Sequence, residues 1–254
     1  MIHGMWCGGW CWDHYKAFFE AAGYRCVATT LPYHDENSRT HPDARLGTSS
    51  LLDDVDFLEQ QIRALPEKPV IMGHSMGGLL AQMLAARGLA EAVVLLCPAP
   101  PAGIFGTTPS VFRCFWNVLK LRGFWRRPVS PSFDDVVYGS LHLMPEADRK
   151  QVFERLVHES GRKIFEIGFW PFDGRRASRV DETRVKCPML VVGAGQDRLT
   201  PASVVRRVAR KYRHVAEYRE FPDHAHWVLG EPGWEEIAGS INAWLASTLP
   251  KREP

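Results

Sequence analysis

The stretch "VIMGHSMGGLL", residues 70–80, places one serine among three glycines at the junction of two apolar runs. Glycine destabilises the interior of a helix or a strand, because it loses the most backbone freedom on folding. The glycines at 73, 77 and 78 therefore indicate a sharp bend around Ser75, where other parts of the chain approach closely. The apolar residues before the bend predict a strand, and those after it predict a helix.

Residues 73–77, "GHSMG", match the pattern G-x-S-x-G in the strand-to-helix context that marks a nucleophilic serine. A tight turn of this kind exposes the hydroxyl at the end of the sheet. The N–H groups of the following helix then favour a developing negative charge beside it. The alternative is a glycine-rich turn that carries an ordinary surface serine. The flanking strand and helix favour the first interpretation, so we predict that Ser75 is a nucleophile.

Short apolar runs alternate with helix-type segments along much of the chain. We predict strands at residues 24–29, 70–73, 92–97, 189–193 and 215–221. All but the last are continuous apolar runs, as expected for parallel strands that are buried on both faces. Helical patterns lie between them, and one opens on a capping box formed by Ser50 and Asp53. This alternation predicts a doubly wound α/β protein with a mostly parallel sheet.

The alternation stops between Cys97 and Cys187, where the sequence is helical in type, rich in aromatic residues and punctuated by proline and glycine. A loop of this length without secondary structure is uncommon in a compact domain. We therefore predict a helical cap at residues 103–180, inserted over the carboxyl edge of a core formed by residues 1–102 and 181–254. Five aromatic residues of the cap are predicted to contribute to a wall above the serine: Phe112, Trp116, Phe165, Phe169 and Trp170.

Composition narrows the classes of function. The chain has 254 residues, is 45% hydrophobic and carries a formal net charge of +2, which gives no reason to expect a nucleic-acid partner. Its six cysteines show neither a CxxC pair nor a zinc-type spacing, so we expect free thiols, no metal and no cofactor. No apolar run approaches the roughly 18 residues that span a membrane. No signal peptide is visible in the chain as given, so we expect a cytoplasmic location.

Four segments together resemble the α/β-hydrolase fold family: the "GHSMG" motif, "IHG" at residues 2–4, "GAGQD" at 193–197, and "HAHW" at 224–227 followed by Glu-Pro. The resemblance covers nearly the whole chain. The stretch "HGMWCGGWCWDHY", residues 3–15, is most similar to the branch of small esterases that includes plant methyl esterases and hydroxynitrile lyases. The resemblance implies a Ser–His–Asp triad, and it places the helical insertion where that family carries its cap.

A serine hydroxyl needs a base to activate it, and the base needs an acid to orient it. Asp197 follows a predicted strand at the sheet edge where Ser75 also emerges, and the resemblance gives it the role of the acid. His224 and His226 are both candidates for the base. The family's spacing to a following Glu-Pro pair favours His226 and leaves His224 to line or cap the loop. The remaining histidines, such as His3, are expected to be structural or solvated.

Acyl transfer also requires N–H groups that stabilise an oxyanion. The resemblance assigns this role to the backbone N–H groups of Met76, directly after the serine, and Met5, directly after "HG". Trp6 is a candidate for substrate binding at the acyl site. We expect Trp10 and Trp12 to lie in the core.

These residues predict a serine hydrolase that cleaves small carboxylic esters of short to medium chain through an acyl-enzyme intermediate. Thioesterase, lactonase and carbon–carbon bond hydrolase activities stay open, because all can use one triad. Hydroxynitrile lyases have a threonine at the position of Gly4 and a lysine at that of Trp227, and both differences count against that chemistry. A non-catalytic small-molecule receptor of the same fold is a further alternative, although such proteins often lose a triad residue.

The resemblance also implies a short first strand. Related proteins reach "HG" at the end of a complete central strand that follows two edge strands, whereas Met1 and Ile2 alone precede it here. We therefore expect about six parallel strands in the family order 4-3-5-6-7-8. In that order the short strand lies between residues 24–29 and 70–73. A start downstream of the natural one, or a true short variant, would each account for this.

Overall fold

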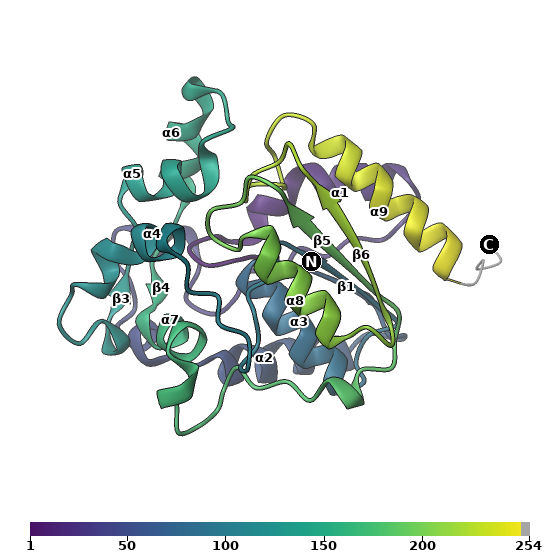
Figure 1. Cartoon of the computed structure of the whole chain (residues 1–254), viewed down its shortest axis with the longest axis horizontal. Coiled ribbons are helices and arrows are strands. Elements are labelled where there is room, and N and C mark those ends of the chain that lie inside the picture. The colour runs from purple at the N-terminus through teal and green to yellow at the C-terminus, as the bar shows by residue number, and fades with distance from the viewer. Residues whose placement is uncertain (250–254) are drawn as a thin grey trace.

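The computed structural model describes residues 1–249. A parallel sheet of four strands forms its centre, in the order β1–β2–β5–β6 (Figure 1). These strands are Val70–His74, Ala92–Leu96, Met189–Ala194 and Ala216–Phe221. Each neighbouring pair runs parallel, and β1, β2 and β5 are almost entirely buried. The predicted α/β class with a parallel sheet is therefore confirmed.

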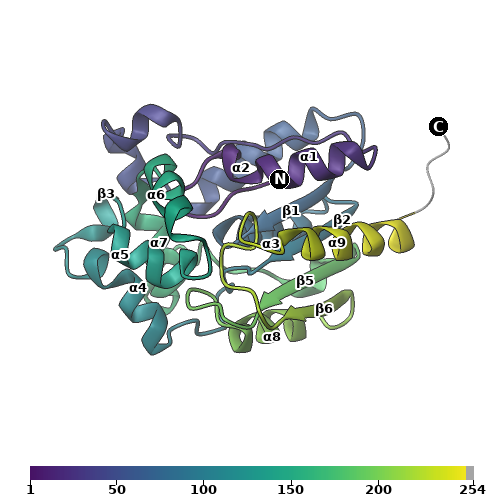
Figure 2. The same cartoon turned by 90° about the horizontal axis from the view of Figure 1, so that it is seen from above.

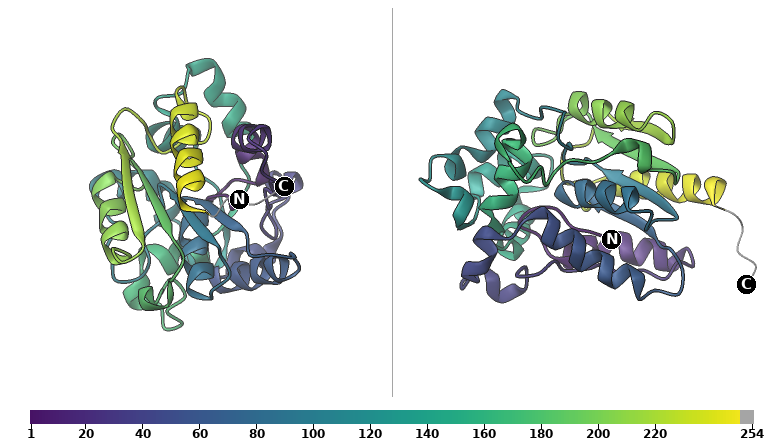
Figure 3. Two further views of the ribbon diagram at one scale, coloured as in Figure 1. Left: turned by 90° about the vertical axis from the view of Figure 1, so that its right-hand side faces the viewer. Right: turned by 90° about the horizontal axis from the view of Figure 1, so that it is seen from below.

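Helices cover both faces of this sheet (Figure 3). One face packs against α1 (Asp13–Ala21) and α9 (Trp234–Thr248), whereas the other packs against α2 (Leu51–Arg63), α3 (Met76–Ala86) and α8 (Ala202–Lys211). Successive side chains of a strand point to opposite faces, so a strand covered on both sides must be apolar throughout. This explains the unbroken apolar run of β2, whose residues alternate between the two cores.

The first residues extend the sheet beyond β1. Ile2 forms single parallel bridges to Gly73 and to Thr29, and its N–H donates to the carbonyl of Met72 over 2.8 Å. The order of segments thus follows the predicted 4-3-5-6-7-8. The prediction of a strand at residues 24–29 is wrong, however, except at Thr29. A strand needs a partner along its length, and within residues 1–249 this segment is met only by Met1, through hydrogen bonds to Val27 and Thr29, and by the bridge of Ile2 to Thr29.

The segment predicted to be a cap lies at one end of the sheet (Figure 2). It contains helices α4 (Pro109–Leu119), α5 (Phe133–Val136), α6 (Glu146–Arg155) and α7 (Gly161–Gly168). Strands β3 (Pro128–Val129) and β4 (Glu159–Ser160) pair antiparallel within it. Short 3-10 turns occur at Gly9–Trp12, Glu36–Arg39, Ala44–Thr48, Phe124–Arg126, Trp170–Phe172 and Glu182–Arg184, and a π-helical turn at Val137–Leu141. Within residues 1–249, no helix is both long and apolar enough to cross a bilayer.

A buried ionic cluster joins these helices to the central domain. The ammonium of Lys163 on α7 lies 2.6 Å from a carboxylate oxygen of Asp54 on α2, and 3.5 Å from Glu159. The second carboxylate oxygen of Glu159 lies 3.0 Å from Nε2 of His34. All four side chains are fully buried. Removing one member of such a cluster leaves an uncompensated buried charge. The intact cluster therefore favours a single position of α7 on α2.

Candidate active site

Ser75 occupies the turn between β1 and α3 with φ of 54° and ψ of −119°. A non-glycine residue at positive φ is strained, and such strain persists only where the surrounding structure enforces it. Here the enforcement comes from close packing on either side of the serine. A Cβ atom on Gly73 would collide with the carbonyl oxygen of Gly77, and one on Gly77 would collide with that of Ile2. The glycines are thus required by close backbone contacts around the turn.

Asp197 lies in the loop after β5 and is fixed by four hydrogen bonds. Its Oδ2 lies 2.7 Å from Nδ1 of His226 and accepts from the hydroxyl of Thr200 over 2.8 Å. Its Oδ1 accepts from the backbone N–H groups of Leu199 and Thr200, each over 2.8 Å. Burial alone would raise the pKa of Asp197, but the adjacent imidazole and these hydrogen bonds lower it. The ionised carboxylate therefore accepts from Nδ1–H of His226, which leaves the Nε2 lone pair free.

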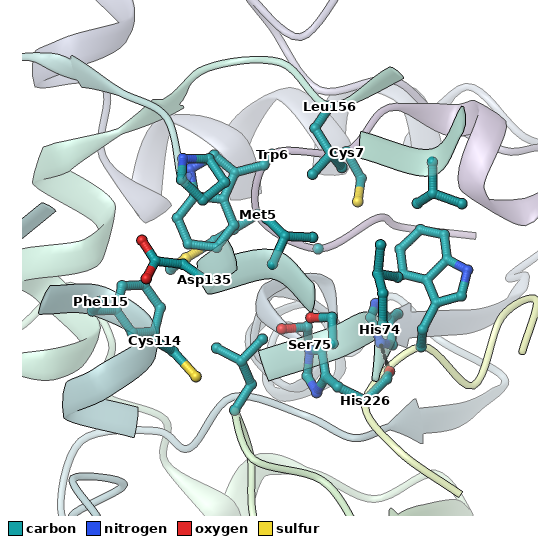
Figure 4. A pocket seen from close by; sticks show the side chains of 18 residues that line it. Met5, Trp6, Cys7, His74, Ser75, Cys114, Phe115, Asp135, Leu156 and His226 are labelled. Atoms are coloured by element: carbon teal, nitrogen blue, oxygen red, sulfur yellow. Dashed lines mark hydrogen bonds between the residues drawn. The ribbon is translucent and has the colours of Figure 1, made fainter. Parts of the chain in front are cut away.

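Ser75 and His226 line the same cavity, opposite Trp6 and Phe115 (Figure 4). Their side chains are not hydrogen-bonded to each other in this structure. Hydrogen bonds of this kind often tighten only when substrate is bound. His74 lies behind the pair, with Nε2 2.9 Å from the carbonyl oxygen of His226. Burial, together with the nearby His226, lowers the pKa of His74 to about 3, so a neutral imidazole supports this backbone.

His224 is occupied elsewhere in the same loop. Its Nδ1 lies 2.9 Å from Oε1 of Glu231, which also accepts from the backbone N–H of Ala225 over 2.8 Å. Its carbonyl accepts from the N–H of Gln196 over 2.9 Å, which links the loop to the one that carries Asp197. This arrangement agrees with the expectation that His224 shapes the loop while His226 faces the cavity.

Met76 directly follows Ser75, and Met5 lies close to it. Met76 is the first residue of α3, so its N–H is one of the groups that a helix start leaves unpaired. Met5 follows Gly4, which passes so close that a Cβ there would lie 2.9 Å from Cβ of Ser75. Both residues line a cavity that Ser75 also lines. Binding of an oxyanion by the N–H groups of Met5 and Met76 stays a prediction.

His3 has a part in this arrangement that the sequence analysis did not assign. The N–H of Leu31 donates to its Nε2 over 3.0 Å, so the ring proton is on Nδ1, which donates to the carbonyl of Gly4 over 2.8 Å. Burial lowers the pKa of His3 to about 3, which keeps the ring neutral. Because a peptide group is planar, fixing the Gly4 carbonyl also fixes the direction of the Met5 N–H. In the sequence, the position of His3 directly before Gly4 is the feature that could have indicated this role.

Two cavities meet at Ser75. The smaller encloses about 50 Å³ and is lined by Trp6, His226 and Trp227, among others. The larger encloses about 100 Å³ between α4 and α7, where Leu119, Ile164 and Ile167 contribute to its wall. Both include Met5, Ser75, Phe115 and Leu199, so the serine can reach either one. Their walls are mainly apolar, as is usual for small-molecule sites.

The predicted aromatic wall is correct for two of five residues. Phe112 and Phe169 line the larger cavity, whereas Phe165 stacks on Phe169, Trp170 packs against Phe105 and Trp116 is exposed. The inward positions of α4 include Val111, Phe115 and Leu119, which recur every fourth residue. Trp116 lies four residues after Phe112, on the side of the helix where Phe112 is itself half exposed, and is 62% exposed. Trp6 lines the smaller cavity, and its indole N–H donates to the carbonyl of Val129 over 3.2 Å.

Within residues 1–249, one group of side chains has the spacing of a metal site. The ligand atoms of Cys97, Asp197 and His226 lie within 4.8 Å of one another. The carboxylate and the imidazole, however, already bind each other. Burial raises the pKa of the Cys97 thiol well above its ordinary value, which favours the neutral form rather than the thiolate that binds metals. These residues therefore fit a hydrogen-bonded acid–base pair better than a metal site.

Part of the sequence is similar to that of known proteins. Methylesterase 8 from Arabidopsis thaliana is 36% identical over 81 residues, which cover 31% of this chain and 28% of that protein. Salicylic acid-binding protein 2 from Nicotiana tabacum is 30% identical over 79 residues, which cover 31% of this chain and 30% of that protein. The matched segment thus spans less than a third of the length of these curated relatives.

Solved structures resemble the chain over its whole length. The crystal structure of a methylesterase from Arabidopsis aligns with a TM-score of 0.68 at 14% identity, covering 98% of both chains. A pyrethroid hydrolase from Sphingobium faniae aligns with a TM-score of 0.71 at 19% identity, covering 97% of this chain and 95% of the other. At such identities the likeness concerns the fold. The model of the alpha/beta hydrolase family matches residues 1–239, and the chain therefore belongs to that family.

Proposed function

We propose that this protein is a carboxylic ester hydrolase in which Ser75 is the nucleophile, His226 the base and Asp197 the acid that orients it. The observation that carries the proposal is the 2.7 Å contact between Asp197 Oδ2 and His226 Nδ1, beside a cavity that Ser75 enters from a strained turn. Strain and a buried ionised carboxylate are each costly to maintain. Their meeting at one cavity favours catalysis over a structural role.

The reaction follows from these positions. His226 Nε2 takes the proton of the Ser75 hydroxyl as Oγ attacks the carbonyl carbon of the ester. The carbonyl oxygen becomes an oxyanion and accepts hydrogen bonds from the N–H groups of Met76 and Met5. As the tetrahedral intermediate collapses, His226 gives its proton to the leaving alkoxide. A water molecule, deprotonated by the same imidazole, then releases the acid and restores the hydroxyl of Ser75. No metal or cofactor is needed for these steps.

The two cavities suggest how an ester lies in the site. His226 lines the smaller cavity, and the base must protonate the leaving group, so we assign the alcohol to that side. The acyl chain then occupies the larger, apolar cavity between α4 and α7. Volumes of about 50 and 100 Å³ favour a small alcohol and a short to medium acyl chain. The methylesterase and hydrolase names of similar proteins agree with ester chemistry.

A panel of p-nitrophenyl esters of increasing acyl length tests this function. We expect turnover that is highest for short and medium chains. Replacing Ser75→Ala is expected to remove nearly all of it, and also labelling by a fluorophosphonate probe, while the fold is retained. Activity of Ser75→Ala within tenfold of the natural protein would contradict the assignment. Ligand binding without turnover of any ester, thioester or lactone would favour a receptor of the same fold.

A further inference from the structure

We propose that the outer face of α4 and the chain that follows it, residues 112–127, docks onto surfaces of anionic lipid and so presents the larger cavity to apolar esters held there. We call this surface the cap face. The docking stands on the charge and exposure of these residues, whereas delivery of an ester to Ser75 rests on the proposed function. Figure 1 shows α4 on the outside of the molecule, away from the sheet.

The cap face is strongly basic. No aspartate or glutamate occurs between Glu91 and Asp134, whereas residues 112–127 contain five cations: Arg113, Lys120, Arg122, Arg126 and Arg127. Their local charge of +5 exceeds the +2 of the whole chain, so the remainder of the chain is net negative. All five are exposed, and none forms an ion pair with another residue that the structure describes. A cluster of about four to eight such cations on one surface is typical of binding to anionic lipid.

Large apolar side chains are exposed among these cations. Trp116 is 62% exposed, Phe112 49%, Leu121 41% and Trp125 40%. A hollow on the surface is lined by Phe112, Arg113, Trp116 and Asp135, which places a cation and aromatic rings side by side. Tryptophan and arginine suit the boundary between water and lipid, where a ring or an aliphatic stem is buried while the polar end stays hydrated. The exposed side chains therefore have the composition of an interfacial surface.

The cap face adjoins the larger cavity at two points. Phe112 belongs both to the exposed face and to the cavity wall. At the other end, the ring of Trp125 lies 6.2 Å from that of Phe165, which stacks at 5.6 Å on Phe169 of the cavity wall. The same helix thus carries the docking surface outside and the cavity wall inside. An ester in a lipid surface would enter beside the cap face rather than cross open water.

Charge decides between the candidate partners. A second copy of the chain would bring two +5 faces together in a two-fold interface, which like charges oppose. The first acidic residues after the cap face in the sequence, Asp134 and Asp135, lie in the first turn of α5. Asp135 lines the hollow and accepts from the amide of Asn117 over 2.6 Å. A single-stranded nucleic acid would match the charge and the aromatic rings. It would not account for an apolar cavity opening beside them, whereas an anionic lipid surface accounts for all three features.

Sedimentation with lipid vesicles tests the proposal. The protein is expected to bind phosphatidylcholine vesicles that contain phosphatidylglycerol, to leave pure phosphatidylcholine vesicles largely unbound, and to dissociate at about 1 M salt, where charges are screened beyond about 3 Å. The variant Arg122→Glu/Arg126→Glu should bind mixed vesicles at least about tenfold more weakly. Arg210→Glu/Arg213→Glu makes the same change of charge on and just after α8, away from the cap face, and should bind within about twofold of the natural protein.

Turnover separates this proposal from the proposed function. Both variants should hydrolyse a water-soluble short ester at the natural rate, which also shows that they fold. Only Arg122→Glu/Arg126→Glu should lose turnover of an ester embedded in mixed vesicles. Hydrolysis of the soluble ester without vesicle binding would overturn the docking surface and leave the hydrolase intact, whereas vesicle binding without hydrolysis of any ester would do the reverse. Equal binding of both variants, or binding of single-stranded DNA but not of vesicles, would overturn the docking proposal.

Discussion

Glu231 holds His224 by a contact of 2.9 Å between Oε1 and Nδ1, and thereby fixes the loop on which His226 stands. Glu231 is itself almost fully buried, and burial raises its pKa. The same Oε1 accepts from the backbone N–H of Ala225, the residue between the two histidines. One histidine of "HAH" therefore shapes the loop, while the other is free to meet Asp197.

We expect the two histidines to differ sharply when each is replaced. His226→Ala should lower kcat/KM for a p-nitrophenyl ester by about a thousandfold or more, because it removes the proposed base. His224→Ala should be only moderately impaired, since it loosens the loop without removing the base. Comparable circular dichroism spectra would serve as the control. A larger loss for His224→Ala than for His226→Ala would mean that the assignment of the base is wrong.

The hydrogen bond from His3 to Gly4 is predicted to act through the Met5 N–H. His3→Leu removes the donor and should lower kcat by up to about a hundredfold, the usual effect of losing one oxyanion donor. KM should change little, because the oxyanion exists only after attack. His3→Asn carries an amide N–H in place of Nδ1–H and should retain more activity than His3→Leu. Equal kcat in the two variants would show that this hydrogen bond does not position the amide.

The close packing around the serine turn predicts the effect of a single methyl group. Gly77→Ala should reduce the free energy of unfolding by about 1–3 kcal/mol or more, because the new Cβ would overlap the carbonyl of Ile2. Gly239→Ala on α9 is the matched control, since no atom outside the adjacent backbone of its own helix lies within 4 Å of its Cβ position. That variant should be neutral, or more stable by about 0.5–1 kcal/mol. Urea denaturation measures both, and similar losses would contradict the packing argument.

The buried ionic cluster predicts how stability depends on pH. Burial alone would raise the pKa of Glu159, but Lys163 and His34 outweigh it and hold that pKa well below its ordinary value. Its stabilising effect is therefore complete above the unfolded-state pKa of about 4.3 and is lost as pH falls toward the folded-state pKa. Glu159→Gln should be less stable than the natural protein by about 3 kcal/mol near neutral pH.

The same comparison at low pH provides the check. Between neutral pH and about pH 3, the natural protein should lose more stability than Glu159→Gln, so the two curves of unfolding free energy should converge. Parallel curves over this range would show that Glu159 does not keep its charge in the folded state.

The sequence by itself determined the elements whose local pattern permits one interpretation. The apolar runs at β1, β2 and β5 are strands because residues buried on both faces must be apolar at every position. The Ser50 capping box starts α2 as predicted, because its hydrogen bonds lie within one turn. The strained turn at Ser75 could likewise be predicted from the sequence, since only glycine tolerates such close backbone contacts on both sides of the serine.

Tertiary structure decided what depends on a partner distant in sequence. Residues 24–29 have the composition of a strand, yet only Thr29 forms a β-bridge in the described part of the chain, because Met1 and Ile2 are too short a neighbour to pair with the whole segment. Trp116 is aromatic like Phe115, but the rotation between successive helix positions turns it to the surface. The small net charge of the whole chain likewise gave no indication of the basic cap face, because acidic residues elsewhere balance its five cations. Local pattern determines which element a segment can form, whereas contacts between distant segments determine which of its side chains meet.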